Sequence, residues 1–162
     1  MGDEVSVLVV GDGPVSGALR PMVEALGWVA HVATDAEGVT EALPTADAVV
    51  VLSHHEGIDA PAIKEALAAG TPYVGAMGSR RTQTRRREWL LGNGLSEDDL
   101  GALRAPVGLD IGADTPGEIA ISILAEVVAV RRGSDVAVGS ISERDGAIHP
   151  DAAPGTATCP GG

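Results

Sequence analysis

The chain has no phenylalanine, a single cysteine and only three aromatic side chains, Trp28, Trp89 and Tyr73. One cysteine excludes an internal disulfide and a Cys-X-X-Cys metal site within one chain. So few aromatics exclude a stacking platform for nucleic-acid bases. No apolar run approaches the roughly 20 residues that cross a bilayer, and the N-terminus lacks the basic and apolar segments of a signal peptide. We therefore expect a cytoplasmic protein.

Positive charge is also scarce, because 11 Lys and Arg residues face 23 Asp and Glu residues, for a net charge of −12. Such a chain has no general affinity for nucleic acids or anionic membranes, and neither is expected as a partner. Hydrophobic residues make up 44% of the chain, mostly alanine and valine, together with 22 glycines. Small side chains of this kind suit helices that pack closely on a parallel sheet.

Short apolar runs alternate with helical patterns along the chain. The patterns predict strands over 5–10, 28–34, 48–52, 73–77 and 106–109, and helices over 15–26, 35–43, 60–69, 79–91 and 119–130, with a short helix from 96. This alternation predicts an α/β, Rossmann-like, three-layer fold with a parallel sheet of about five strands.

We expect the strand order 3-2-1-4-5, which places a ligand crevice at the carboxyl ends of the first and fourth strands. The Rossmann-like domain is expected over 1–133. A C-terminal extension is expected over 134–162, with its last dozen residues disordered.

The first candidate site is the loop after the first strand, Gly11-Asp12-Gly13-Pro14, which opens a helix. Gly11 would permit a tight turn, and Gly13 would let backbone N–H groups approach a phosphate at the helix N-terminus. Asp35, at the end of the second strand, is placed to accept a hydrogen bond from a ribose hydroxyl. The pattern therefore favours a nucleotide or another phosphate-bearing ligand. The alternative is that the glycines only permit close packing of helix and strand.

The second candidate site follows the fourth strand and reads Gly78-Ser79-Arg80-Arg81. Ser79 can cap the next helix. The freed N–H groups and the two guanidinium groups would then concentrate positive potential at one point of an acidic chain, which favours anion binding. The three further arginines at 85–87 are expected to lie on a solvated helix face.

Two more loops follow expected strands. The side chains of adjacent His54 and His55 cannot both face one point on an extended chain, so no metal site is predicted there. His54 could contact a ligand or move a proton near neutral pH, or it could simply pack on the sheet edge. Asp110, after the fifth strand, either binds a ligand or holds backbone N–H groups of its loop. No catalytic residue is predicted.

The expected helix over 119–130 is apolar nearly all round, with Glu126 as its only charge. A capping-box pattern, from Thr115 to Glu118, precedes it. A helix of this composition is buried in the core or against another subunit. We therefore expect a homodimer.

Three runs of sequence resemble the C-terminal Rossmann-like domain of the XdhC/CoxI family, the accessory proteins of xanthine dehydrogenase and carbon monoxide dehydrogenase. They are YVGAMGSRR at 73–81, APVGLDIGA at 105–113 and TPGEIAISILAEVVAVR at 115–131, and the segments at 11–16 and 146–150 also fit. The resemblance implies a role in the maturation of molybdenum hydroxylases. Members bind the molybdenum cofactor, of the molybdopterin type, protect it during sulfuration and help to insert it into the apoenzyme.

The resemblance also implies partners. They are the molybdenum hydroxylase apoenzyme, a cysteine desulfurase and, because the family commonly carries a cysteine-containing N-terminal domain, a separate protein of that N-terminal type. The leading hypothesis is thus a non-enzymatic binding and delivery module. Two alternatives stay open. One is an oxidoreductase, or its detached cofactor domain, that binds an NAD(P)-like dinucleotide. The other is a regulatory nucleotide-sensing domain within an oligomer.

Overall fold

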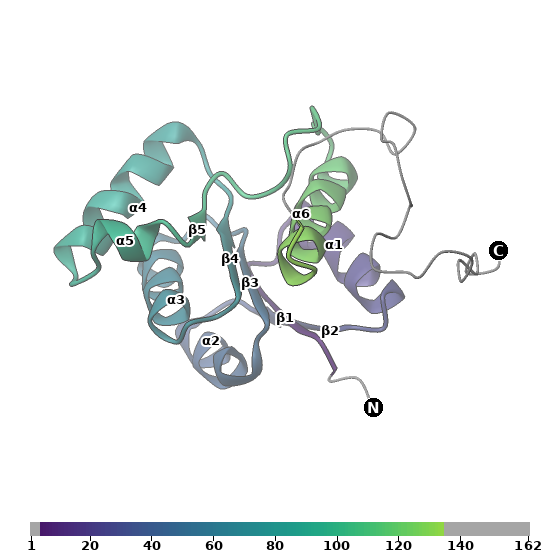
Figure 1. The fold of residues 1–162 in the computed structure, drawn as a ribbon, viewed down its shortest axis with the longest axis horizontal. Coiled ribbons are helices and arrows are strands. Elements are labelled where there is room, and N and C mark those ends of the chain that lie inside the picture. The colour runs from purple at the N-terminus through teal and green to yellow at the C-terminus, as the bar shows by residue number, and fades with distance from the viewer. Residues whose placement is uncertain (1–3, 135–162) are drawn as a thin grey trace.

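The computed structural model describes residues 4–134. Its centre is a parallel sheet of five strands: β1 (Ser6–Val10), β2 (Val29–Ala33), β3 (Ala48–Val51), β4 (Tyr73–Ala76) and β5 (Leu103–Arg104). The helices are α1 (Pro14–Ala25), α2 (Ala36–Ala42), α3 (Glu56–Ala68), α4 (Arg80–Gly92), α5 (Glu97–Leu100) and α6 (Pro116–Arg131), with a 3-10 turn, η1, at Leu43–Thr45. Helices α1 and α6 cover one face of the sheet, and α2 to α5 lie on the other (Figure 1). The predicted three-layer α/β class is confirmed.

The strand order is 2-1-3-4-5, so the expected order 3-2-1-4-5 is wrong. The reason lies in the burial of two strands. All four residues of β3 are buried, as three consecutive valines require, whereas β2 exposes His31 and Val32 and suits an edge. Because parallel crossovers are right-handed, the reversal after β2 puts α1 and α2 on opposite faces. The strand order now reverses between β1 and β3, and the ligand crevice of such a sheet is expected there.

Two element boundaries also differ from expectation. Strand β5 ends before Pro106 instead of spanning 106–109, because proline has no N–H to donate to β4. Helix α3 begins at Glu56 and not at residue 60, so Asp59 lies within its first turn and is buried.

Alternate residues of a strand point to opposite faces of the sheet, and an apolar layer lies on each face. In β1, Val7 and Val9 face α1 and α6, whereas Leu8 and Val10 face the opposite helices. Helix α6 is only partly covered, because Ile121 stays 52% exposed. The homodimer stays a prediction, as does the domain boundary at 133. The expected extension lies outside the described residues except for Ser134. Within residues 4–134, no helix has the length and apolar character that a membrane span needs.

The predicted capping box at the start of α6 is present. Glu118 Oε2 accepts hydrogen bonds from Thr115 N at 2.7 Å and from Asp114 N at 3.1 Å, and Thr115 Oγ1 accepts one from Glu118 N at 3.3 Å. The bonds from Thr115 and Asp114 hold the pKa of Glu118 below its usual value.

A carboxyl whose pKa is lowered by folding stabilises the protein above its unfolded pKa of about 4.3. That contribution is lost as the pH falls through the lower pKa of the folded state. We therefore expect Glu118→Gln to unfold at lower urea concentration than the parent at neutral pH, and the difference to shrink in acid. A difference that stays constant with pH would show that the carboxylate charge does not stabilise the helix.

Candidate functional site

A cavity of about 360 Å³ lies at the carboxyl ends of β1 and β3. Residues 10–16 and 52–55 form most of its lining, joined by Thr34 after β2 and Met77 after β4. We call this cavity the crevice. It occupies the point where the strand order reverses, which is where open α/β sheets bind ligands. Four of the predicted site residues line it: Gly11, Gly13, Pro14 and His54.

Gly11 brings the loops after β1 and β3 together. Its φ is +115°, and a Cβ there would lie 2.8 Å from Ser53 N and 3.0 Å from Ser53 Cα. Its N–H also donates to Ala33 O at 2.8 Å. Only glycine fits this position, because any side chain would press on the backbone of Ser53. The tight turn predicted for Gly11 is thus present.

Gly13 leaves the N-terminus of α1 open to the crevice. It is the N-cap residue, makes no side-chain hydrogen bond, and a Cβ there would meet nothing within 4 Å. Pro14 follows at the first helical position, and Val15 and Ser16 line the crevice. No described residue accepts a hydrogen bond from the backbone N–H of Val15 or Ser16. These donors and the helix dipole suit an anion.

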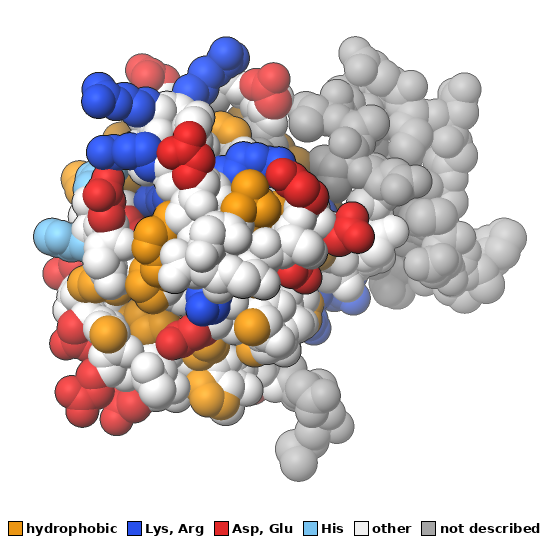
Figure 2. Space-filling model, turned by 90° about the vertical axis from the view of Figure 1, so that its left-hand side faces the viewer, with side chains coloured by type: hydrophobic (Ala, Val, Ile, Leu, Met, Phe, Trp, Pro, Cys, Tyr) orange, Lys and Arg blue, Asp and Glu red, His pale blue; other side chains and the backbone are white. Residues whose placement is uncertain are grey.

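The loop after β4 lies one strand further from Gly13 than expected, because β3 separates β1 from β4. Ser79 caps α4, as predicted, by accepting a hydrogen bond from Thr82 N at 3.2 Å. Arg80 and Arg81 are exposed and form no ion pair with any described residue. The crevice lining stops at Met77 and does not include the segment 78–81. Figure 2, viewed from the α4 side, shows Lys and Arg side chains gathered at one end of this face.

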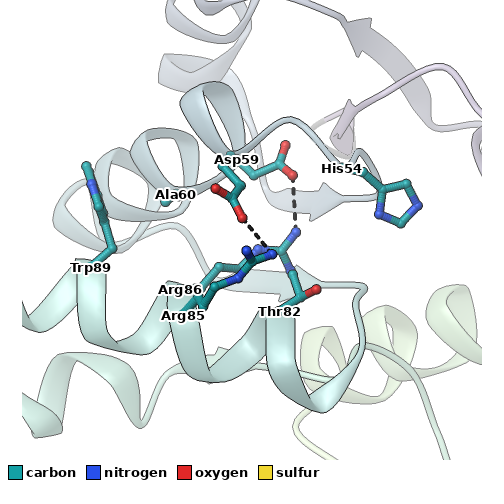
Figure 3. A pocket seen from close by; sticks show the side chains of 8 residues that line it. His54, Asp59, Ala60, Thr82, Arg85, Arg86 and Trp89 are labelled. Carbon is teal, nitrogen blue, oxygen red and sulfur yellow. Dashed lines mark hydrogen bonds and ion pairs between the residues drawn. The ribbon is translucent and has the colours of Figure 1, made fainter.

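A second cavity, of about 260 Å³, lies between α3 and α4 and is called the groove below (Figure 3). Its lining consists of His54, Glu56, Asp59, Ala60, Thr82, Arg85, Arg86 and Trp89. His54 lines the crevice as well, so the two cavities meet at this residue. His54 therefore lies where it could contact a ligand in either cavity, and its role stays a prediction.

The expectation that arginines 85–87 share a solvated helix face is wrong for Arg86, which is buried. Its side chain is 6% exposed and pairs with Asp59, 1% exposed, at 3.1 Å. Arg86 also donates to Met77 O at 2.5 Å, and the hydroxyl of Ser53 donates to Asp59. This cluster ties the loops after β3 and β4 to α3 and α4. Its neighbours at 85 and 87 are exposed, as expected.

Helix α6 holds the loop that carries Asp110 through hydrogen bonds to its backbone. Glu126 Oε1 accepts hydrogen bonds from Tyr73 Oη at 2.7 Å and from Gly108 N at 3.2 Å. Burial, reinforced by Glu126, raises the pKa of Tyr73, so its hydroxyl stays a donor. Leu109 N donates to Ser122 O at 3.1 Å. Asp110 itself is exposed and lines neither the crevice nor the groove.

Asp35 caps α2 by accepting a hydrogen bond from Gly38 N at 2.8 Å. It does not line the crevice, although the preceding Thr34 does. Its predicted contact with a ribose therefore stays a prediction. Within residues 4–134, no group of three or more His, Cys, Asp or Glu side chains could hold a metal ion.

Comparison with protein families matches residues 7–127 to the XdhC Rossmann domain. The chain belongs to this family. The resemblance drawn from the three sequence runs is thereby confirmed. This XdhC domain is 32% identical over 128 residues to the molybdenum cofactor insertion chaperone PaoD of Escherichia coli, a match that covers 78% of the chain and 40% of PaoD.

Two further relatives carry names connected with xanthine dehydrogenase. The XdhC domain is 35% identical over 86 residues to a probable xanthine dehydrogenase subunit of Bacillus subtilis, over 53% of the chain and 24% of that protein. A crystal structure described as a xanthine dehydrogenase from Bacillus halodurans superimposes with a TM-score of 0.63 at 25% identity, over 80% of this chain and 45% of that one. The chain thus spans less than half the length of each of these relatives.

Proposed function

We propose that this XdhC domain is a binding module in the maturation of molybdenum hydroxylases and holds the molybdenum cofactor, or a related phosphate-bearing nucleotide, in the crevice. The observation that carries the proposal is the uncapped N-terminus of α1, which opens into the crevice at the reversal of strand order. The kinship with a molybdenum cofactor insertion chaperone supports the choice of ligand.

The crevice residues fit the phosphate end of such a cofactor. The backbone N–H groups of Val15 and Ser16 would donate to phosphate oxygens, and the missing side chain of Gly13 lets these oxygens approach. Arg80 and Arg81 would add charge from the loop after β4. They form an ion pair with no described residue, and the dipole of α4 disfavours cations at its N-terminus. Such a local conflict is expected where function requires it.

The domain would hold and orient the cofactor without a chemical step of its own, and the molybdenum chemistry would be supplied by the cofactor in the client enzyme. The proposed partners are a molybdenum hydroxylase apoenzyme, a cysteine desulfurase, a separate protein of the N-terminal XdhC/CoxI type and a second copy of this chain.

Mass spectrometry of small molecules that co-purify with the full chain tests this function. We expect a pterin or its nucleotide form. Recovery of NAD(P) together with hydride transfer would establish the oxidoreductase alternative instead. Recovery of an ordinary nucleotide that changes the oligomeric state would establish a sensor. A chain that retains no such molecule from a host that makes the cofactor would contradict the proposal.

Gly13→Val should weaken binding of the recovered molecule by about tenfold or more, because a branched side chain would occupy the phosphate position. Stability should change little, since a Cβ at Gly13 meets nothing within 4 Å. The matched control is Gly17→Val, one turn further along α1, where a Cβ also meets nothing within 4 Å and the residue does not line the crevice. Calorimetric affinities that are equal for both variants would overturn the role of Gly13.

A further inference from the structure

We propose that the outward face of α6 is a self-complementary interface, on which a second copy of this chain packs its own α6 in antiparallel orientation across Ala125. This inference rests on the proposed function only in that a second copy is already among its partners. It assigns that copy a surface, an orientation and the residues that hold it, and it does not depend on the ligand of the crevice.

The inner face of α6 is occupied within the domain. Ala120, Ile123 and Val127 are buried in the core, and α1 packs along this helix (Figure 1). The polar residues Ser122 and Glu126 are buried as well, and both accept hydrogen bonds from the backbone of the loop after β5. These contacts fix the rotation of α6 about its axis, and they therefore decide which of its residues face outward.

The outward face of α6 is an apolar stripe. Ile121, Ala125 and Val128 follow one another at spacings of four and three residues, which places them on one side of the helix. Ile121 is 52% exposed, Ala125 and Val128 are half-buried, and none of the three packs into either apolar layer of the sheet. Gly117 continues the stripe toward the start of the helix. The stripe contains no charged side chain, whereas exposed ion pairs lie on α1, α3 and α4.

The net charge of the chain restricts the surfaces on which two copies can meet. Each copy carries −12, so two copies repel each other, and contact between their acidic surfaces would add to the repulsion. An uncharged face avoids this penalty, and its association removes apolar surface from water. The stripe of α6 is such a face.

The charges at the two ends of α6 make this face complementary to itself. Asp114 and Glu118 lie at its N-terminal end, and Arg131 and Arg132 lie at its C-terminal end. Neither Asp114 nor Arg132 forms an ion pair with a described residue. In an antiparallel pair the acidic end of each helix lies against the basic end of the other, whereas a parallel pair would bring like charges together. A two-fold dimer requires a patch that complements itself in this way.

The spacing of these residues places the two-fold axis at Ala125. Glu118 and Arg132 each lie seven residues from Ala125, which is about 10.5 Å along the helix axis. When two copies cross at Ala125, Glu118 of each is level with Arg132 of the other, and Ile121 of each packs beside Val128 of the other. The small side chain of Ala125 lets the two axes approach to the short end of the usual range of about 8–10 Å.

Sedimentation equilibrium of the full chain tests the interface. We expect a dimer at micromolar concentration. Ile121→Asp should raise its dissociation constant about a hundredfold or more, because the variant would bury a charge between the two helices. The matched control is Leu91→Asp, which adds the same charge at a partly exposed leucine of α4, on the other face of the sheet.

Both variants should keep the circular dichroism spectrum of the parent, since both side chains are more than one-third exposed. A parent chain that is monomeric at micromolar concentration, or equal effects of the two variants on dimerisation, would overturn the proposal.

Disulfide cross-linking tests the antiparallel orientation. With the one native cysteine, Cys159, replaced by serine, Ala125→Cys should link two copies under mild oxidation, because helices that cross there bring their Cα atoms to about 4–5 Å. The matched control is Gly117→Cys, whose two copies would lie about 24 Å apart in the antiparallel pair and could not be joined. Equal yields at both positions would indicate a parallel pair, and no link through Ala125→Cys would place the interface elsewhere.

Failure of the interface and failure of the proposed function are distinguishable. If the parent chain is monomeric but retains a pterin or its nucleotide form, the interface is wrong and the proposed function stands. If Ile121→Asp dissociates a dimer from which no such molecule is recovered, the interface stands and the proposed function fails. If the parent is monomeric and Ile121→Asp abolishes binding of a separate protein of the N-terminal XdhC/CoxI type, the face belongs to that protein and the proposal is wrong.

Discussion

Replacing Arg86 with methionine is expected to lower the free energy of unfolding by about 3–5 kcal/mol, because it leaves the carboxylate of Asp59 buried without its cation. The loss includes the hydrogen bond from Arg86 to Met77 O, which fixes the loop after β4. Urea denaturation of the parent and the variant measures the difference. A variant as stable as the parent would show that Asp59 finds another partner or is neutral.

The adjacent arginine supplies the matched control. Arg85 also pairs with a carboxylate of α3, but its pair is exposed, so Arg85→Met should change the free energy of unfolding by less than about 1 kcal/mol. The double variant Asp59→Asn/Arg86→Met removes both charges and should recover part of the stability that Arg86→Met loses. If the double variant is less stable than Arg86→Met, the unpaired charge is not the main penalty.

The fold class followed from periodicity, whereas the strand order depended on a weaker signal. Alternating strands and helices predicted the parallel sheet and its two helical layers. The strand order depended on which strand is buried on both of its faces and therefore lies inside the sheet. The valines at 49–51 already indicated an interior strand, and His31 within β2 indicated an edge. Weighing these two segments against each other would have favoured the observed order.

The residues of the candidate site also differ in how far the sequence could predict them. Those defined by a local pattern were predicted, and those defined by contacts between distant segments were not. Gly11 and Gly13 were found because one short loop carries their whole pattern. The pairing of Asp59 with Arg86 joins residues 27 positions apart on two helices, and it depends on the register of both. A carboxylate between Ile58 and Ala60 was a usable sign of burial, but nothing local to Asp59 identified its cation. The lining of the groove could not be predicted from the sequence, because it depends on how α3 packs against α4.

The anion site proposed at the start of α4 needs a control variant that leaves the buried Arg86 in place. Replacing Arg86 would disturb the loops after β3 and β4, because its side chain contacts both. Arg80 and Arg81 are exposed, unpaired among the described residues and at the first turn of α4. Each guanidinium that reaches a phosphate contributes about 1.5–3 kcal/mol.

Arg80→Ala/Arg81→Ala should therefore weaken binding of the co-purified phosphate-bearing molecule by about a hundredfold or more, since 1.4 kcal/mol is tenfold. The charge-matched control is Arg20→Ala/Arg87→Ala, which removes two exposed arginines that already pair with carboxylates and lie outside the crevice and the groove. Calorimetry at low and high salt distinguishes a site from diffuse attraction, because screening weakens only the latter strongly. Two double variants with equal effects that disappear at high salt would mean a general basic surface, and the anion site at Ser79–Arg81 would then be withdrawn.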